Sequence, residues 1–199
     1  MRRWRAAASA LLALALVGGL AACTGDPLAE SYRNGDSKGY IAGDFRVVEI
    51  PEGERGEPVE FSGVTDRGED VSDADFAGKV LVVNFWYAAC GPCRVEAPFL
   101  EDVYQQYSAE GADFLGVNTY DQAETAASFA EKYSISYPSV IAVNDGSVKL
   151  AFAKAAPLQA TPTTLVLDRE GRVAARIIGQ LEDASILATI VRETLEESS

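Results

Sequence analysis

An apolar strand followed by two cysteines constrains the fold of this chain more than any other feature. Residues 80–86 (VLVVNFW) are apolar on both faces of a pleated strand except at Asn84, which is typical of a central strand covered on both sides. Cys90 and Cys93 follow directly, and residues 94–110 carry apolar side chains at helical spacing. The sequence therefore predicts a core strand, a short loop with two cysteines and a helix that starts at the cysteines.

Composition excludes several classes of function. The chain has 199 residues, of which 48% are hydrophobic, which is enough for one domain-sized core. Thirty acidic residues against 17 basic ones give a formal charge of -13, and this argues against a nucleic-acid partner, because phosphate binding needs clustered Lys and Arg. The chain contains no His, so imidazole metal sites, His general bases and haem-attachment motifs are excluded.

The amino terminus has the layout of a secretory signal. Residues 1–5 carry three Arg, and residues 6–22 form a run of small and apolar side chains that ends in Leu-Ala-Ala before Cys23. This ending resembles the lipobox of bacterial lipoproteins, in which Cys23 would be the lipid attachment site and the first mature residue. An uncleaved membrane anchor is the alternative, but the run is rich in Ala and Gly. We expect a lipid-anchored protein on the extracytoplasmic face of the cell membrane.

Three segments are predicted on this basis: a lipoprotein signal peptide at 1–22, a tether with a lead-in strand at 23–57, and one domain at 58–199. The pattern of apolar residues predicts further elements. They are strands at 46–50 and 59–63 as an N-terminal β-hairpin extension, a helical turn at 72–76, a strand at 114–118, a helix at 123–133, short strand-like runs within 140–153, a β-hairpin of 163–167 with 173–178, and a final helix at 182–197. The fold class is therefore α/β, with a mixed central sheet and helices on both faces.

The two cysteines near the helix start carry the chemistry. If Cys23 is lipidated, Cys90 and Cys93 are the remaining thiols of the chain. At a helix N-terminus the free backbone N–H groups and the helix dipole favour the thiolate of Cys90, which makes it a nucleophile. Pro92 suits the first turn of a helix, and Cys93 is placed to resolve a mixed disulfide formed at Cys90.

Two other interpretations of the cysteine pair remain open at this stage. A purely structural disulfide would suit an oxidising compartment, but a bridge that closes so short a loop removes little chain entropy. A zinc site would need carboxylate ligands in place of further Cys or His. Redox chemistry is the favoured interpretation, with no metal and no cofactor.

The strand and the cysteine motif together resemble a known family. VNFW at 83–86 followed by CGPCR at 90–94 resembles the active-site strand and helix of the thioredoxin superfamily in its TlpA-like (ResA-like) branch, and the similarity covers about residues 58–195. ATPTT at 160–164 is similar to the cis-proline loop of that family. The resemblance implies a thioredoxin fold with a central insertion at 120–159 and a cis bond between Thr161 and Pro162. It also implies client contacts at Trp86, Gly91, Pro92, Thr161 and Pro162.

Two further positions gain meaning from the resemblance. Glu96 matches an acidic residue that lies near the thiols in TlpA-like proteins, where it would relay protons; alternatively, it only complements the helix dipole. Asn84 stands where cytoplasmic thioredoxins have a buried Asp. Ala89 stands where many relatives have a Trp before the first cysteine, so the surface that faces the substrate is expected to differ.

The sequence thus predicts a membrane-tethered thiol–disulfide oxidoreductase. It would exchange disulfides with extracytoplasmic proteins and be recharged by a membrane thiol-redox partner. The resemblance favours a reductase, with cytochrome c maturation as one process it would serve, although an oxidant role is compatible with the same motif. A peroxiredoxin-like peroxidase is one alternative, but Tyr87 and Val83 replace the Thr and Pro of that motif. A copper-delivery protein is another, but its C-x-x-x-C motif and distant His are absent.

Overall fold

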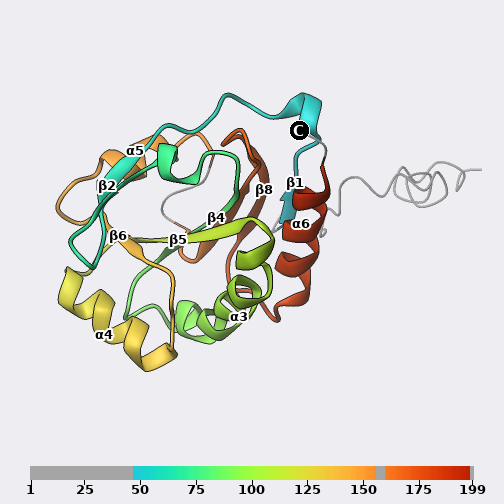
Figure 1. The fold of residues 1–199 in the computed structure, drawn as a ribbon. Helices are drawn as coiled ribbons and strands as arrows, with labels where there is room; N and C mark the ends of the chain where they lie inside the picture. The colour runs from blue at the N-terminus through green and yellow to red at the C-terminus, as the bar shows by residue number, and fades with distance from the viewer. Residues whose placement is uncertain (1–46, 156–159, 198–199) are drawn as a thin grey trace, which may run out of the picture. The chain divides into compact units, whose positions relative to one another are not determined.

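A six-stranded mixed sheet forms the centre of the computed structural model, which describes residues 47–155 and 160–197. The strand order is β1-β8-β7-β4-β5-β6 (Figure 1). The strands are β1 (Val47–Glu49), β4 (Val80–Trp86), β5 (Ala112–Asn118), β6 (Ser139–Ile141), β7 (Thr163–Leu167) and β8 (Val173–Ile178). β4, β5 and β6 are parallel to one another, and β7, β8 and β1 are added with antiparallel pairings. The predicted signal peptide, Cys23 and the tether up to residue 46 lie outside the described residues.

β4 is the central strand, as its sequence predicts. All seven of its residues are buried, and it pairs with β5 on one side and β7 on the other. Val80 and Val82 point to one face of the sheet, and Leu81, Val83 and Phe85 point to the other. Both faces of β4 therefore belong to a packed core.

Helices cover both faces of the sheet. On the face of Val80 and Val82, α3 (Gly91–Tyr107) and α6 (Ser185–Glu196) lie side by side (Figure 1). The opposite face is covered by Phe61, Phe76 and Phe152, whose rings pack on one another and on Phe85. α4 (Ala123–Tyr133) packs beside the start of α3, where it helps to enclose the cysteines.

The N-terminal elements differ in detail from the expectation. β1 is not part of a hairpin, because it pairs with β8 at the edge of the main sheet. The hairpin is formed instead by β2 (Ser62–Val64) and β3 (Asp70–Ser72), with the turn-rich segment 65–69 between them. The short helices η2 (Glu52–Glu54) and η3 (Asp73–Phe76) follow β1 and β3, and η3 matches the predicted helical turn.

The chain between β5 and β7 contains one element that the sequence pattern did not identify. α4 has the predicted bounds, but the second strand-like run within 140–153 is the short helix α5 (Ser147–Ala151) rather than a strand. A short apolar run fits a strand and a buried helix equally well, since its length does not decide between them. Here Val148 and Phe152, four residues apart, both enter the core from one side of this helix.

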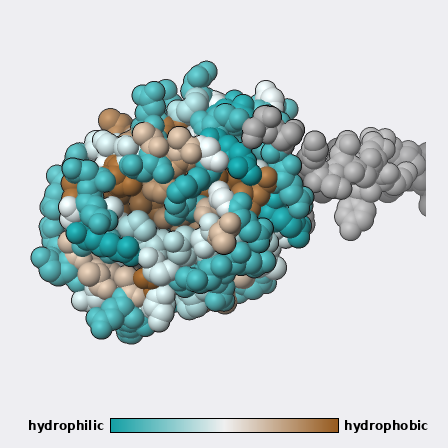
Figure 2. Space-filling model, viewed as in Figure 1, coloured by the Kyte–Doolittle hydropathy of each residue, from teal (hydrophilic) through white to brown (hydrophobic). Residues whose placement is uncertain are grey.

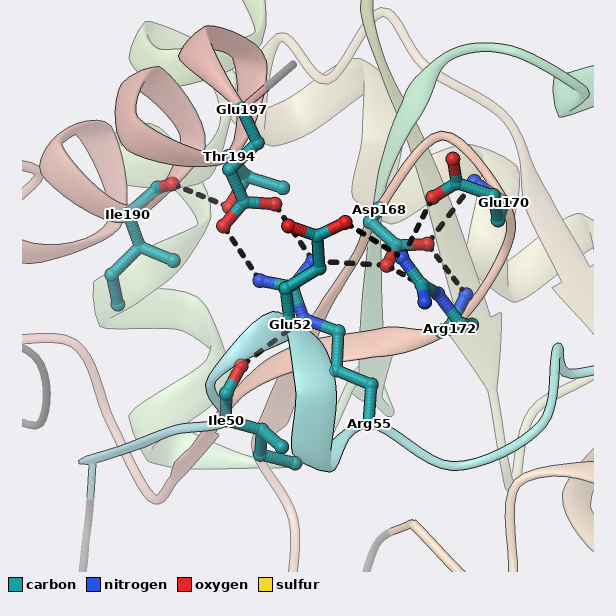
Figure 3. Close-up of polar contacts among 9 residues, drawn as sticks. All are labelled: Ile50, Glu52, Arg55, Asp168, Glu170, Arg172, Ile190, Thr194 and Glu197. Atoms are coloured by element: carbon teal, nitrogen blue, oxygen red, sulfur yellow. Dashed lines mark hydrogen bonds and ion pairs between the residues drawn. The ribbon is translucent and has the colours of Figure 1, made fainter. Parts of the chain in front are cut away.

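A cluster of charged side chains fastens the N-terminal segment to the body of the domain (Figure 3). Arg55 donates to Asp168 at 2.9 Å and to both carboxylate oxygens of Glu197 at 2.7 and 2.6 Å. Asp168 also accepts from Arg172 at 2.9 Å, and Arg55 Nε donates to the carbonyl of Ile50. These contacts join the segment after β1 to the β7–β8 turn and to the residue that follows α6.

The face of the molecule seen in Figure 2 is largely hydrophilic, with hydrophobic residues gathered in separate patches. This agrees with the excess of acidic residues in the chain. In the two stretches that the structure describes, no helix has the length and apolar character needed to cross a membrane.

Candidate active site

Cys90 and Cys93 form a disulfide at the N-terminus of α3. Their Cα atoms are 5.3 Å apart, and the backbone N–H of Cys93 donates to the Sγ of Cys90 at 3.1 Å. Cys90 is thus the N-cap of the helix, and Pro92 lies in the first turn, where its missing N–H leaves no helical bond unmade. The predicted position of the pair at a helix start is confirmed.

The loop before the disulfide is held by the same helix that follows it. The N–H of Cys90 donates to the carbonyl of Tyr87 at 3.1 Å. Arg94 reaches back along the loop and donates to the carbonyls of Ala88 and Ala89, both at 2.9 Å. Its guanidinium therefore fixes the two residues that lead into Cys90.

A second loop, after β5, also fastens this segment, and sequence reasoning missed it. Asp121 accepts from the N–H of Ala88 at 2.6 Å and from the side chain of Asn118 at 3.0 Å. The Asn118 side chain in turn accepts from the N–H groups of Tyr120 and Asp121 at 3.0 and 2.7 Å. The parallel pairing of β4 with β5 places these two loops together at the same edge of the sheet, which no local pattern reveals.

Trp86 lies behind the disulfide as part of the core. It is 6% exposed, its ring lies 4.3 Å from that of Phe129, and its indole N–H donates to Ser139 at 3.2 Å. Gly116 makes room for this contact, because a Cβ at that position would overlap Ser139 and lie 2.8 Å from the indole nitrogen of Trp86. The structure thus places Trp86 in the wall of the site, and a contact of Trp86 with clients stays a prediction.

Glu96 is fully buried one helical turn beyond Cys93. One carboxylate oxygen accepts from the side chain of Asn84 at 2.8 Å, and the other accepts from the N–H of Leu181 at 3.0 Å. Asn84 also donates to Thr164 at 3.0 Å, which fixes the orientation of its amide. Burial raises the pKa of Glu96 from 4.5 to about 7, because desolvation disfavours the charged form more than the two hydrogen bonds favour it.

A small cavity lies beside Cys93 and Asn84. Its volume is about 10 Å³, close to the space occupied by one water molecule. Its walls include Cys93, Asn84 and Trp86. Asn84 therefore lines the same cavity as Cys93, and its amide also binds the carboxylate of Glu96.

The other residues predicted to contact clients differ in how far they are buried. Gly91 and Pro92 are exposed, Thr161 is half-buried and Pro162 is buried. The bond between Thr161 and Pro162 is cis, as the family resemblance implied. Contacts of these residues with clients stay a prediction. Across residues 47–155 and 160–197, no three Cys, Asp or Glu side chains are grouped closely enough to hold a metal ion.

Comparisons with known proteins agree with this geometry. Residues 48–191 match the model of the Redoxin family. The chain is 28% identical over 118 residues to the thiol-disulfide oxidoreductase ResA of Bacillus cereus, a match that covers 59% of this chain and 65% of that protein. It is 32% identical over 120 residues to ResA of Geobacillus kaustophilus, with 60% and 66% covered. The chain thus matches somewhat less than two thirds of the length of these relatives.

A solved structure resembles about three quarters of the chain. The crystal structure of a DsbF homologue from Corynebacterium diphtheriae superposes with a TM-score of 0.65 and 27% identity, and the match covers 76% of this chain and 95% of that one. The thioredoxin fold expected from the sequence is confirmed by this match and by the strand order of the sheet.

Proposed function

The chain belongs to the Redoxin family, and we propose that it is a thiol–disulfide oxidoreductase that exchanges disulfides with client proteins through Cys90 and Cys93. The observation that carries the proposal is the disulfide at the N-terminus of α3, where the N–H of Cys93 points at the sulfur of Cys90. In the reduced protein the same N–H and the helix dipole favour the thiolate of Cys90.

In the reducing direction the exchange has two steps. The Cys90 thiolate attacks one sulfur of a client disulfide, the client S–S bond breaks, and one client thiolate leaves. The Cys93 thiolate then attacks the Sγ of Cys90, which releases the second client sulfur and forms the Cys90–Cys93 disulfide. Two electrons pass from the cysteine pair to the client, and a redox partner must return two electrons for the next cycle. The oxidising direction runs the same steps in reverse.

Glu96 is the proposed proton acceptor for the second step. Cys93 must lose its proton before it attacks Cys90, and it is buried, so bulk water has little access to it. Glu96 lies one turn away on α3, and burial raises its pKa to about 7. A carboxyl group with such a pKa accepts and releases protons near neutral pH. The water-sized cavity between Cys93 and Asn84 supports a short route for that proton.

The cellular setting is a further part of the proposal. The signal-like residues 1–22 and the lipobox at Cys23 support a lipid-anchored protein that faces outward, with extracytoplasmic protein thiols and disulfides as substrates and a membrane thiol-redox partner. The resemblance of residues 83–86 and 90–94 to the TlpA-like branch favours the reducing direction, with cytochrome c maturation as the process it would serve.

The activity is tested by following the reduction of a disulfide-linked fluorescent peptide pair by the reduced protein. We expect the wild type to separate the pair, and Cys90→Ser to be inactive although its fold is intact by circular dichroism. A Cys90→Ser protein as active as the wild type would contradict the proposed chemistry.

Direction and anchoring need separate measurements. Equilibration of the Cys90–Cys93 couple with glutathione buffers gives its reduction potential, and a value near that of thioredoxin, about -270 mV, supports a reductase, whereas one near that of DsbA, about -120 mV, supports an oxidant. For the anchor, Cys23→Ser should abolish incorporation of labelled lipid. Lipid that remains attached to this variant would contradict the lipoprotein assignment.

A further inference from the structure

Tyr87 and Tyr120, on two loops next to the disulfide, form a partly exposed aromatic surface: Tyr87 is half-buried against the cluster that contains Cys90 and Cys93, and Tyr120 is exposed. Tyr120 is 75% exposed, and its ring lies 5.7 Å from that of Tyr87, centroid to centroid. We call this pair the tyrosine ledge. A large aromatic side chain exposed to this extent leaves apolar surface in contact with water. A partner that covers the ring removes this surface from water, which favours binding.

The backbone of the ledge is fixed relative to Cys90. The carbonyl of Tyr87 accepts a hydrogen bond from the N–H of Cys90, and the N–H of Tyr120 donates to the Asn118 side chain at 3.0 Å. Asp121, the neighbour of Tyr120, bonds the N–H of Ala88. Because both loops are tied to each other and to Cys90, covering the ledge requires little ordering of the chain, which favours binding.

The residues around the ledge indicate that it binds a partner mainly through aromatic and apolar contacts. The two charged side chains that contact the loop, Asp121 and Arg94, already bond the backbone N–H of Ala88 and the carbonyls of Ala88 and Ala89. Ala88 and Ala89 separate Tyr87 from Cys90 in the chain and carry only methyl side chains, so no bulky side chain from these two residues covers the rings.

A client must bring its own sulfur to Cys90, and successive residues of an extended peptide lie about 3.3–3.6 Å apart. The residues next to the client's cysteine are therefore within reach of the loop that carries Tyr87. We propose that the tyrosine ledge binds a large apolar or aromatic side chain next to the reactive cysteine of a client protein, and so selects such clients. This inference rests on the proposed function and specifies the substrate class of the same site.

The test uses two synthetic peptides in which one cysteine is joined to 2-nitro-5-thiobenzoate as a mixed disulfide. The cysteine is flanked by Phe in one peptide and by Ser in the other. The reduced protein releases the coloured thiolate, and the ratio of the two second-order rate constants is measured within each variant, so that a general loss of reactivity cancels.

We expect the wild type to react faster with the Phe peptide, by about two- to thirteenfold, the range that an aromatic pair contributes. Tyr120→Ala should lower the ratio of the two rate constants towards the value of a protein that makes no aromatic contact with the peptide. Tyr120→Phe, which keeps the ring, should retain the preference for the Phe peptide. Leu150→Ala is the matched control, because Leu150 is equally exposed at 75% but lies on α5, outside the ledge.

The outcomes separate this inference from the proposed function. An equal ratio for wild type and Tyr120→Ala, or a ratio that falls as much in Leu150→Ala, overturns the inference while the exchange chemistry stands. If the wild type releases thiolate from neither peptide, or does so independently of Cys90, the proposed function fails and the inference fails with it.

Discussion

The side chain of Asn84 in the central strand donates a 2.8 Å hydrogen bond to the carboxylate of Glu96 in the helix that carries the cysteines. Both groups are buried, and Asn84 also lines the cavity that reaches Cys93. The proposed proton path from Cys93 to Glu96 rests on this arrangement of Asn84.

Replacing Glu96 should change how stability depends on pH. Because burial raises the pKa of Glu96 from 4.5 to about 7, the folded protein keeps a proton there that the unfolded chain has already released between these values. The free energy of unfolding therefore falls as the pH rises through this window, by a total of about 3 kcal/mol. Glu96→Gln should lack this fall, which chemical denaturation at pH 4 and pH 8 can measure.

The Gln side chain fits the same space. Its oxygen can accept from the N–H of Leu181, and its NH₂ can donate to Asn84 once the Asn amide has flipped. Glu193→Gln, on the exposed side of α6, removes one carboxylate from the surface and serves as the control. If Glu96→Gln and the wild type lose equal stability between the two pH values, the carboxyl of Glu96 does not titrate as described.

Asn84→Ala removes one of the two donors to the carboxylate of Glu96 and keeps the other, the N–H of Leu181. The pKa of Glu96 should therefore rise further, and the pH at which thiol exchange reaches half its maximal rate should move upward. Stopped-flow reaction of the reduced protein with a small aromatic disulfide, recorded between pH 5 and 9, gives this profile. Thr164→Val removes the other partner of Asn84 and should shift the profile less; an unshifted profile in Asn84→Ala would separate Asn84 from the proton path.

Gly116→Ala should destabilise the wall of the site. The added Cβ would overlap Ser139 and lie 2.8 Å from the indole nitrogen of Trp86, so either the strand or the Trp86–Ser139 hydrogen bond must shift. Overpacking of this kind costs about 1–3 kcal/mol. Urea denaturation followed by tryptophan fluorescence measures the loss. In Gly91→Ala the new Cβ meets no atom within 4 Å, so an equal loss of stability there would contradict the steric explanation.

Arg55→Ala tests the charged cluster in Figure 3. The substitution removes the bonds to Glu197 and to Asp168, but Asp168 keeps Arg172 and two backbone N–H groups. The loss in unfolding free energy should therefore be about 2 kcal/mol, below the cost of leaving a buried carboxylate with no partner. Arg172→Ala, which removes the more exposed cation, should cost less in the same denaturation experiment. The reverse order would show that Arg55 does not anchor the N-terminal segment.

The sequence predicts those elements whose apolar pattern is long or strongly alternating. β4, α4, β7 and β8 have the predicted bounds, because runs of five or more residues distinguish burial on two faces from burial on one. The short helix α5 and the pairing of β1 with β8 were not predicted. α5 is too short for a helical period of apolar residues to be recognised in its sequence. The pairing of β1 with β8 joins residues that are far apart in the chain.

The residues of the site divide in the same way, into those that a local motif predicts and those that only the folded chain brings together. Cys90, Cys93 and Glu96 are close in sequence, so one helix explains their grouping. The N–H of Leu181, which binds Glu96 from 85 residues away, has no signature in a local motif. The same is true of Asp121, which reaches Ala88 only because β4 and β5 are parallel neighbours.

The measurement that tests the central claim most directly is mass spectrometry of trapped intermediates. Cys93→Ser, reduced and then mixed with a disulfide-bonded client peptide, should accumulate one covalent adduct, located at Cys90 by peptide mapping, because attack is possible and resolution is not. Cys90→Ser should accumulate little adduct, since Cys93 lies inside the first turn of α3 and not at the N-cap, where the free backbone N–H groups and the helix dipole favour the thiolate of Cys90. An adduct that forms at Cys93 as fast as at Cys90, or no adduct in either variant, would contradict the assignment of Cys90 as the attacking thiol.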